Sequence, residues 1–285
     1  MKLSKHHTLG MIFGLLMAFS YSIIALIVKF SLKIPNEALV FYRSFLALLF
    51  VTPFLFLQKV QFKTKNWPMH FTRAACGVLA IYCYFYTLKQ LSLVNSILLA
   101  NTLPLFVPLV IWIWLKERVP WKRFLASLIG FLGVILILRP SSDSWNVAIM
   151  VGLGTGLFGA VALVGVRQLT KKESSSTIMF HFLAISTCIS FFPLLIWGKL
   201  ESIVSFWPYL LALGFFSMLY QFFVTKTYTY LPASKGASFL YFSIIFGGFF
   251  DWWFWGNIPD LMTYLGVFFI VMGGLLVLYE KPVIK

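Results

Sequence analysis

The sequence predicts an all-α membrane protein with ten transmembrane helices, arranged as two inverted repeats of five helices each. Of its 285 residues, 60% are hydrophobic and only 11% are charged. Soluble domains carry about 25% charged residues, so soluble, disordered and fibrous classes are excluded. The apolar residues form long continuous runs, whereas a membrane β-barrel would show short alternating segments. The chain also aligns with itself at a constant offset, which predicts the repeat.

Ten apolar runs are long enough to cross a bilayer, which takes about 20 helical residues. Charged residues and Pro or Gly clusters mark their ends. The expected spans cover residues 9–31, 37–57, 72–90, 94–115, 121–138, 146–167, 177–197, 207–229, 235–255 and 260–279. The first run is too long for the apolar core of a signal peptide, so we expect an uncleaved first helix. The connections between spans are too short to hold a soluble domain.

The net charge of +15 reflects the orientation of the chain and does not indicate nucleic-acid binding. Most Lys and Arg residues fall in loops on one side of the expected bundle. The loops on the other side hold only Lys33, Lys89, Arg139 and Lys199. Basic residues are retained on the cytoplasmic side, so both termini are expected in the cytoplasm. We expect a bacterial inner (cytoplasmic) membrane location, with the lipid bilayer and a small molecule as partners and no nucleic acid.

No motif indicates a metal or a cofactor. The three cysteines lie in apolar segments without metal-ligand spacing, and we expect neither a metal site nor a cofactor. Gly152, Gly156 and Ala160 repeat every four residues in the sixth span. Such a ridge of small residues lets two helices approach closely, so it predicts helix packing.

A shift of 140 residues superposes the two halves of the chain. It places Leu91 on Leu231, Trp112 on Trp252 and Gly133 on Gly273. The halves are residues 1–140 and 141–285, and each holds five expected spans. Because five is odd, successive copies must lie in the membrane with opposite orientations. This inverted-repeat design is typical of secondary transporters, in which two halves rock around a site near the midplane.

At this point the chain resembles a known family. Tyr42-Arg43 early in the second span, the Leu231–Ser234 connection and the Leu115–Glu117 exit from the fourth span are similar to the EamA group of the drug/metabolite transporter superfamily. A weaker similarity, around Ile258-Pro259-Asp260, is to bacterial S-adenosylmethionine carriers of that group. The resemblance implies two tandem five-span units and the transport of a small metabolite.

Interruptions at matching places in the two halves indicate a candidate substrate site. Pro104 and Pro108 interrupt the fourth span, and Gly247 and Gly248 fall in the ninth. Proline removes a backbone donor, and freed carbonyls at membrane depth are tolerated only beside protein or a water-filled cavity. A simple packing kink is the alternative. Polar and aromatic residues at midspan complete the predicted substrate site, namely Arg43, Tyr82, Tyr86, Asn101, Gln221 and Tyr241.

Ionisable residues inside the membrane are costly and usually functional. Arg43 and Asp251 lie at similar depth in the second and ninth spans, so we expect them to pair and close the outer gate. A static structural ion pair is the alternative. His181 lies near the position that matches Arg43 in the second half, and its imidazole could carry a coupling proton. The alternative for His181 is a histidine that only contacts a neighbouring helix.

The sequence therefore predicts a secondary transporter that moves a small organic metabolite by alternating access, as a monomer or a homodimer. The substrate is expected to be amphipathic or anionic: amino-acid-like, nucleoside-like or an S-adenosyl compound. The alternative is a membrane-embedded lipid-modifying enzyme or a lipid flippase. An enzyme would carry clustered His, Asp, Glu or Cys residues near one interface, and no such motif occurs, so we do not expect an enzyme.

Overall fold

The computed structural model describes residues 5–57, 60, 62–117, 120–138, 147–198, 206–257 and 260–279, and these residues form helices joined by short connections. Arg139, Lys199, Ile258 and Pro259 lie outside the described residues. The helices of the first half are α1 (Lys5–Phe30), α2 (Asn36–Leu57), α3 (Trp67–Gln90), α4 (Leu93–Ala100), α5 (Leu103–Leu115) and α6 (Trp121–Leu138). Those of the second half are α7 (Val147–Leu169), α8 (Ser175–Trp197), α9 (Trp207–Tyr230), α10 (Ala233–Ser238), the 3-10 helix η2 (Phe239–Tyr241), α11 (Phe242–Trp255) and α12 (Leu261–Tyr279).

Eight helical stretches within the described residues are long and apolar enough to cross a membrane. Two of them are chains of shorter helices, α4 with α5 and α10 with η2 and α11. Shorter apolar stretches lie in α6 (Phe124–Gly133) and α12 (Leu261–Gly273). The prediction of an all-helical membrane protein is confirmed at this level.

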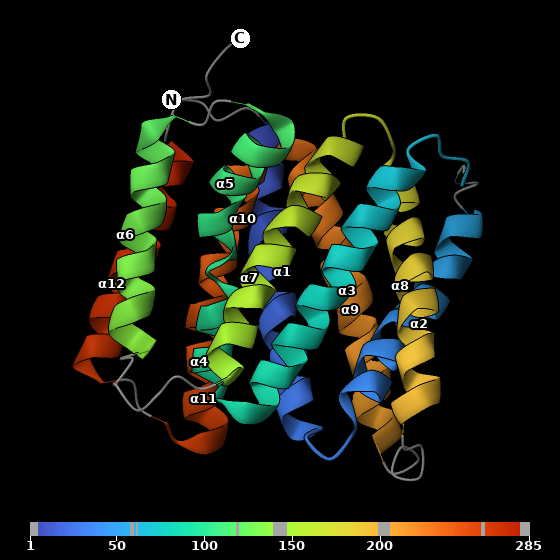
Figure 1. The fold of residues 1–285 in the computed structure, drawn as a ribbon, viewed down its shortest axis with the longest axis horizontal. Helices are drawn as coiled ribbons and strands as arrows, with labels where there is room; N and C mark the ends of the chain where they lie inside the picture. Colours follow the sequence, from blue (N-terminus) through green and yellow to red (C-terminus); the bar gives the residue numbers. More distant parts are fainter. Residues whose placement is uncertain are drawn as a thin grey trace.

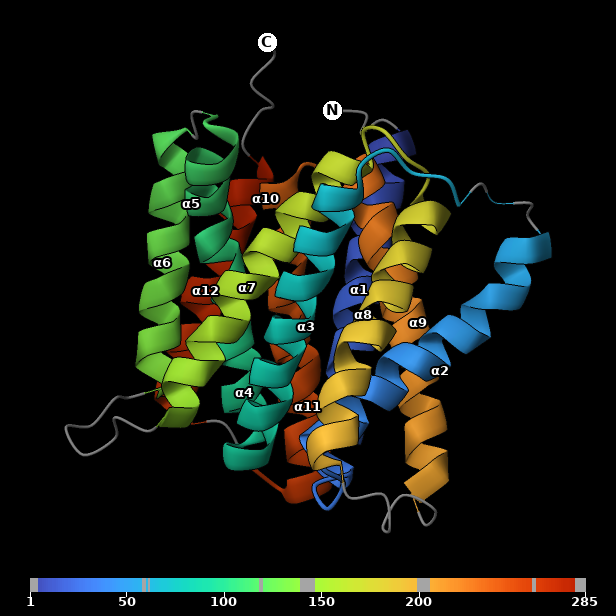
Figure 2. The same ribbon diagram turned by 45° about the vertical axis from the view of Figure 1, so that its right-hand side comes forward.

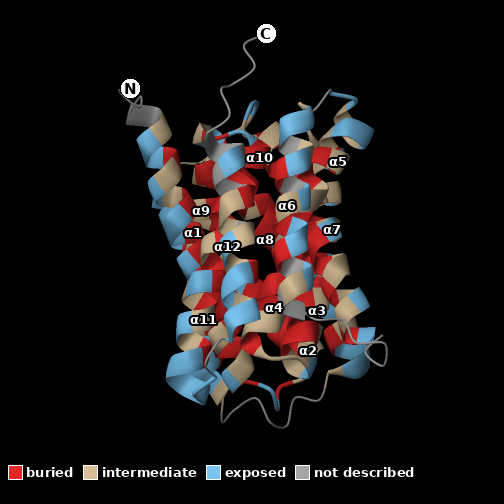
Figure 3. Cartoon of the chain, turned by 90° about the vertical axis from the view of Figure 1, so that its left-hand side faces the viewer, coloured by how far each residue is buried: buried red, intermediate tan, exposed pale blue. Residues whose placement is uncertain are grey.

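Helices from the two halves alternate across the bundle. Helix α1 packs along α9, α3 along α7, and α6 along α12, while α2 contacts both α8 and α9. In Figure 1 the α6–α12 pair stands at one side and α2 and α8 at the other. Figure 2 shows α2 leaning outward toward its C-terminal end. Buried residues face the interior between the helices and exposed ones face outward (Figure 3), as expected for a bundle surrounded by lipid.

The fourth span is broken at Asn101 and Thr102, just before Leu103 and Pro104, the first two residues of α5. Proline has no N–H and its ring clashes with the carbonyl four residues earlier, which here belongs to Ala100, the last residue of α4. The Asn101 N–H bonds to Ile97 O at 2.9 Å, and the Thr102 hydroxyl donates to Leu99 O at 2.7 Å. The predicted interruption is therefore present, but Pro108 lies inside the continuous helix α5.

The ninth span narrows to a 3-10 helix at Phe239–Tyr241, close to the position that the 140-residue repeat offset assigns to the break in the fourth span. This position differs from the predicted one, because Gly247 and Gly248 lie within the continuous helix α11. Hydroxyl groups loosen the helix here, since Ser238 Oγ donates to Ser234 O at 3.1 Å and Ser243 Oγ to Leu240 O at 2.6 Å. Such bonds from serine to the preceding turn often bend helices.

The two broken spans are hydrogen-bonded to each other. Asn101 Nδ2 donates to Ile97 O at 2.7 Å and to Ser243 Oγ at 2.9 Å. Ser22 Oγ of α1 donates to Ser243 O at 3.0 Å. Asn101 thus joins the break of one half to the break of the other, and α1 covers the junction.

Small residues of α7 face the broken fourth span, which confirms the predicted packing ridge. A Cβ atom built on Gly156 would lie 2.1 Å from Thr102 Oγ1 and 3.0 Å from the Leu103 backbone nitrogen. A Cβ atom on Gly152 would lie 2.6 Å from a methyl carbon of Leu99. Ala160, one turn further, is fully buried. Helix α7 can approach the break only because these side chains are small.

We predict that Gly156→Ala destabilises the bundle, because the added methyl group overlaps Thr102 and backbone that cannot move aside. The expected loss of unfolding free energy is about 1–3 kcal/mol, typical of overpacking. Gly248→Ala is the matched control: nothing lies within 4 Å of its Cβ position, and alanine favours a helix over glycine. Thermal unfolding in detergent should show a lower midpoint for Gly156→Ala and an unchanged or higher midpoint for Gly248→Ala. Equal midpoints for the two variants would contradict the close approach.

Candidate substrate cavity

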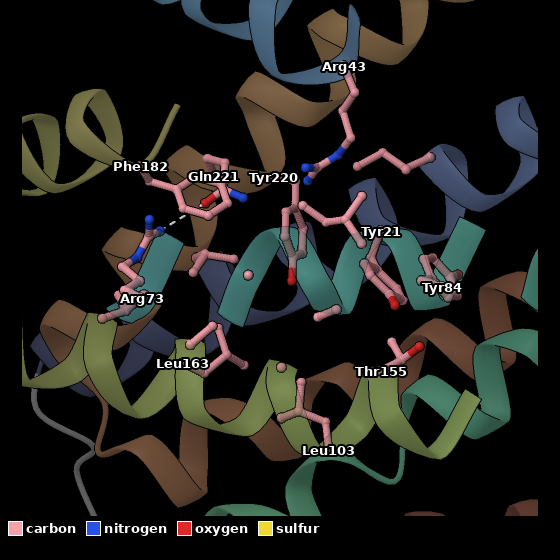
Figure 4. Close-up of a pocket in the computed structure, with 18 of the residues that line it drawn as sticks. Tyr21, Arg43, Arg73, Tyr84, Leu103, Thr155, Leu163, Phe182, Tyr220 and Gln221 are labelled. Carbon is pink, nitrogen blue, oxygen red and sulfur yellow. Dashed lines mark hydrogen bonds between the residues drawn. The ribbon is translucent and has the colours of Figure 1, made fainter. Parts of the chain in front are cut away.

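A cavity of about 80 Å³ lies inside the bundle, where α1, α2, α3, α7 and α9 face one another. Phe182 of α8 and Leu103 of α5 close two further sides. Figure 4 shows polar side chains from several of these helices pointing into the same space. The cavity is therefore shared between the two halves of the chain.

Arg43 of α2 reaches into the cavity and is only 3% exposed. Its Nε and Nη1 atoms are buried and make no hydrogen bond within the described residues. A guanidinium group carries five N–H donors and stays charged, so a buried one requires an acceptor. Arg43 therefore has N–H donors beside the cavity that are available to bind an acceptor.

Arg73 of α3 is the second cation of the cavity and is 2% exposed. Its Nη2 atom donates to Gln221 Oε1 of α9 at 3.0 Å, and its Cζ atom lies 4.0 Å from the centre of the Phe182 ring. The ring face offers partial compensation for the charge. The Nε and Nη1 atoms of Arg73 remain without a partner, as they do for Arg43.

Three tyrosines, Tyr21, Tyr84 and Tyr220, form an aromatic wall in the lining of the cavity. The rings of Tyr21 and Tyr84 stack with centroids 4.8 Å apart and planes 12° apart. The centroid of the Tyr220 ring lies 5.5 Å from that of Tyr21, and in Figure 4 Tyr220 lies beside the Arg43 guanidinium. Thr155 of α7 adds a buried hydroxyl without a partner. The lining thus combines flat apolar surface with hydrogen-bonding groups.

No Asp or Glu lines the cavity in the part of the chain that the structure describes. The two buried arginines therefore have no carboxylate counter-ion in the lining. Burying an unpaired charge costs several kcal/mol, and an anion bound beside it removes much of that cost. The cavity is electrostatically suited to an anion and unsuited to a cation.

Two of the ten predicted substrate-site residues, Arg43 and Gln221, line this cavity. Asn101 and Pro104 lie at the helix break, where Asn101 joins the two broken spans. Tyr82 and Tyr86 are half-buried on α3, outside the cavity lining.

The other predicted positions lie toward α6, α11 and α12. The Tyr241 hydroxyl is buried against Gly130 of α6. Pro108 and Gly248 border two separate hollows, one beside α6 and the other beside α12. A Cβ atom on Gly247 would lie 2.3 Å from a methyl carbon of Ile97, so Gly247 permits close packing of α11 on α4.

The expected pair between Arg43 and Asp251 is not formed. Asp251 accepts a hydrogen bond from Asn257 Nδ2 at 3.3 Å and lies in the electrostatic field of Lys29, at the end of α11. Arg43 instead points into the cavity. The two side chains have different neighbours, although the sequence places them at similar depth in their spans.

His181 is buried outside the cavity, and its Nδ1–H donates to Thr177 O at 2.8 Å. Its ring borders a larger apolar hollow of about 560 Å³ between α3 and α8. Phe71, on the same hollow, is 59% exposed on the outside of the bundle. In a membrane, lipid chains would fill such a surface, so we do not assign the substrate to it.

The main residue that the sequence analysis missed is Arg73. The expected third span begins at residue 72, which places Arg73 at its very end beside the basic loop residues, whereas α3 begins at Trp67. Pro68 in the first turn was the available signal, since proline favours the first helical positions. Earlier placement of the helix start would have put Arg73 inside the membrane.

The comparisons with known proteins agree with this architecture. The sequence model of the EamA-like transporter family matches residues 8–139 and again residues 146–279. The chain belongs to the EamA-like transporter family. It is a membrane transporter and not an enzyme, and the predicted EamA resemblance is confirmed.

Several relatives of this transporter are named for small molecules. The chain is 32% identical to the pseudopaline exporter of Pseudomonas aeruginosa over 92% of this chain and 93% of that one. It is 24% identical to the riboflavin transporter of Vibrio cholerae over 94% and 92% of the two chains. It is 22% identical to the S-adenosylmethionine uptake transporter of Rickettsia felis over 87% and 85%. A solved crystal structure with 15% identity covers 96% of both chains with a TM-score of 0.73, which shows the shared fold.

A polar cluster joins the two halves of the transporter at one end of the bundle. Three donors converge on the Glu173 carboxylate, in the connection between α7 and α8. Thr64 Oγ1 and Asn66 Nδ2 donate to Oε1 at 2.5 and 2.8 Å, and His70 Nε2 donates to Oε2 at 2.7 Å. We call these four residues the Glu173 cluster. The His70–Glu173 contact is an ion pair when His70 is protonated and a hydrogen bond to a carboxylate when it is neutral.

The cluster changes the acidity of Glu173. Burial by itself would raise the pKa of the Glu173 carboxyl, but the hydrogen bonds from Asn66, Thr64 and His70 outweigh burial and hold the pKa below its ordinary value. A carboxyl group with a lowered folded-state pKa stabilises the fold at pH values above its unfolded-state pKa. That stabilisation is lost as the pH falls through the folded-state value.

We predict that Glu173→Gln lowers the unfolding free energy by about 1–3 kcal/mol at neutral pH, because the donors of the cluster lose their charged acceptor. The difference from wild type should shrink as the pH falls below about 4.3, where the wild-type carboxyl begins to protonate. Thermal unfolding midpoints from neutral to acid pH measure this. Glu117→Gln, an exposed carboxyl in the connection after α5, should leave the midpoint unchanged. A Glu173→Gln deficit that is constant down to pH 3 would contradict a lowered pKa.

Proposed function

We propose that this protein is a secondary transporter that carries a small organic anion across the membrane by alternating access. The observation that carries this proposal is the pair of buried arginines, Arg43 and Arg73, with free N–H donors facing a cavity without carboxylates. The aromatic wall of Tyr21, Tyr84 and Tyr220 adds surface for a planar or apolar portion of the substrate. The expected substrate is therefore an amphipathic carboxylate.

The names of the relatives support an organic metabolite as substrate. They include an exporter of pseudopaline and transporters of riboflavin and S-adenosylmethionine. The pseudopaline exporter is 32% identical over nearly the whole chain, whereas the other two are below 25%. The positive charge of the cavity favours anions among the organic metabolites that this protein could carry.

Ten spans in two inverted five-helix repeats provide the mechanical basis of the proposal. Two consecutive matches to the family model support the division into residues 1–140 and 141–285. The breaks in the fourth and ninth spans support it too, because their separation is close to the 140-residue offset of the repeat. In this arrangement α6 and α12 are the fifth and tenth spans, which pair with each other across the repeat.

Equivalent basic side chains at opposite ends of the bundle also support the repeat. Lys29, at the end of α1, donates to Leu91 O at the end of α3 at 2.6 Å. In the second half, Arg167 of α7 donates to Tyr228 O near the end of α9 at 2.6 Å. In each half, a cation of the first helix caps the carbonyls of the third. A two-fold relation between the halves would produce this pair of contacts.

Alternating access also accounts for the small volume of the cavity. Sites for small molecules usually measure about 300–1,000 Å³, so a cavity of about 80 Å³ must widen before a metabolite enters. The Glu173 cluster closes one end, because it joins the start of α3 to the link between α7 and α8, and these three helices border the cavity. We propose that separation of the halves at this end breaks the cluster.

The charge distribution of the loops supports a bacterial inner-membrane location with cytoplasmic termini. The start of α1 and the end of α12 lie at the same end of the bundle in Figure 1, and the Glu173 cluster lies there as well. This end would be the cytoplasmic one. A single chain encloses the whole cavity, so a monomer is sufficient for transport and a homodimer is compatible with it.

Ligand charge tests the proposed function. We expect carboxylates such as benzoate to raise the thermal unfolding midpoint of the purified protein, because binding to the folded state stabilises it. The cation benzamidine, with a ring of the same size, should not. The double variant Arg43→Gln/Arg73→Gln should lose the response to carboxylates, while Lys33→Gln, which removes an exposed cation, should keep it. Stabilisation by benzamidine, or carboxylate binding retained in the double variant, would overturn the proposal.

Access to the cavity tests the gating role of the Glu173 cluster. A cysteine at Thr155, in a background without Cys76, Cys83 and Cys188, reports entry of a membrane-impermeant thiol reagent. Glu173→Gln should raise the labelling rate at neutral pH when the reagent is applied from the side of the cluster, and not from the opposite side. Intact spheroplasts and inverted vesicles present the two sides. An unchanged rate, or the same increase with Glu117→Gln, would contradict a gate at this cluster.

A further inference from the structure

Arg43 and Arg73 occupy separate places in the cavity. Arg43 comes from α2 and lies in the electrostatic field of Tyr21 and Tyr220. Arg73 comes from α3 and is held by Gln221 and Phe182. Figure 4 draws the two guanidinium groups apart, with Tyr220 beside Arg43. Tyr220 lies in the electrostatic field of both arginines. One carboxylate bound to either arginine would therefore leave the other without a counter-ion.

The donor inventory supports the same conclusion. Each arginine keeps two buried nitrogens, Nε and Nη1, without a partner. The N–H bonds of these two nitrogens point in different directions on a guanidinium group. The unpaired donors of each arginine can therefore bind at least one anionic group. Within the described lining, the remaining polar groups of Thr155, Gln221 and the tyrosines are neutral. The cavity therefore requires two negative charges for neutrality.

Both cations come from the first half of the chain. The second half contributes Thr155, Tyr220 and Gln221, which accept or donate hydrogen bonds without charge. Gln221 Oε1 already accepts a hydrogen bond from Arg73, and this bond holds the guanidinium group in place. Arg73 is thus a preorganised site for one anionic group, and Arg43, without a partner in the described residues, is free to adjust to the second.

From this geometry we infer that the substrate carries two separate anionic groups, one bound by Arg43 and one by Arg73, with an apolar or aromatic spacer lying along Tyr220. This inference rests on the proposed anion transport and adds the number and spacing of the charges. Arg73 and Arg43 then determine specificity together, because a monoanion pairs with only one of them.

Carboxylates on a common ring test the inference. Benzoate has one carboxylate, whereas isophthalate and terephthalate have two at different separations. Thermal unfolding midpoints of the purified protein against concentration give an apparent affinity for each probe. At least one dicarboxylate is expected to act at a concentration roughly tenfold or more below that of benzoate, because it gains a second charge-assisted contact.

Single variants assign the two contacts. Arg43→Gln and Arg73→Gln should each remove the advantage of the dicarboxylate over benzoate, whereas Lys33→Gln should preserve it. Midpoints without any probe report whether each variant is folded. Arg73→Lys is a further control: it keeps the charge but loses the planar fork, so it should retain only part of the advantage.

The outcomes separate this inference from the proposed function. Equal affinity for benzoate and both dicarboxylates would overturn the two-anion inference and leave anion transport standing. Stronger binding of phenyl phosphate than of either dicarboxylate would also overturn it, because both charges would then sit on one group. Stabilisation by benzamidine with no response to any carboxylate would overturn the proposed function itself.

Discussion

Inside a bilayer, backbone N–H and C=O groups have no water to bond, so each must find a partner within the protein. Unbroken helices meet this requirement internally, but the breaks in the fourth and ninth spans do not. The Asn101 amide, the Thr102 hydroxyl and the Ser243 hydroxyl supply the missing partners, and Asn101 bonds directly to Ser243. The two breaks must therefore lie against each other and under cover of α1 and α7. This requirement buries the junction of α4 with α5 and the start of α11, and α1, α2, α3, α7 and α9 surround the cavity.

The cavity also contains two buried guanidinium groups, and burying these charges costs free energy. Arg73 is partly compensated by Gln221 and the Phe182 ring, and Arg43 lies among tyrosines, yet both retain free donors. A carboxylate in the lining would neutralise them permanently, and a substrate anion would then have to compete with it. Neutral partners hold the arginines in position, and under the proposed function they would leave the charge of the arginines free to pair with the substrate. Burial away from water makes the arginine charges unfavourable in the empty site. For the same reason it strengthens their attraction to an anion that enters the site.

The sequence was sufficient to predict an all-helical membrane protein, because the length of an apolar run reflects the thickness of the bilayer directly. It was less informative about the cavity, since helices that are apolar on all sides give no signal of which face turns inward. Tyr21, Tyr84 and Tyr220 could not be distinguished from lipid-facing aromatics on that basis. Arg43 and Gln221 were found because polar atoms inside a span require partners, and Arg73 was missed through a helix start placed five residues late. The Glu173 cluster joins residues more than 100 positions apart, and no local pattern encodes such a contact.

Helix α3 carries residues of both the Glu173 cluster and the cavity lining. His70 and Arg73 lie three residues apart, which places them on neighbouring positions of one helical face. His70 holds the Glu173 carboxylate, while Arg73 faces the cavity and holds Gln221 of α9. An anion that draws Arg73 inward therefore acts on the same turn that the Glu173 cluster fixes. If the closed arrangement binds the anion more tightly, then the anion must stabilise closure by the same factor, because coupling between two sites is reciprocal. Under the proposed function, the position of these two residues on one turn would couple anion binding directly to closure of the cavity.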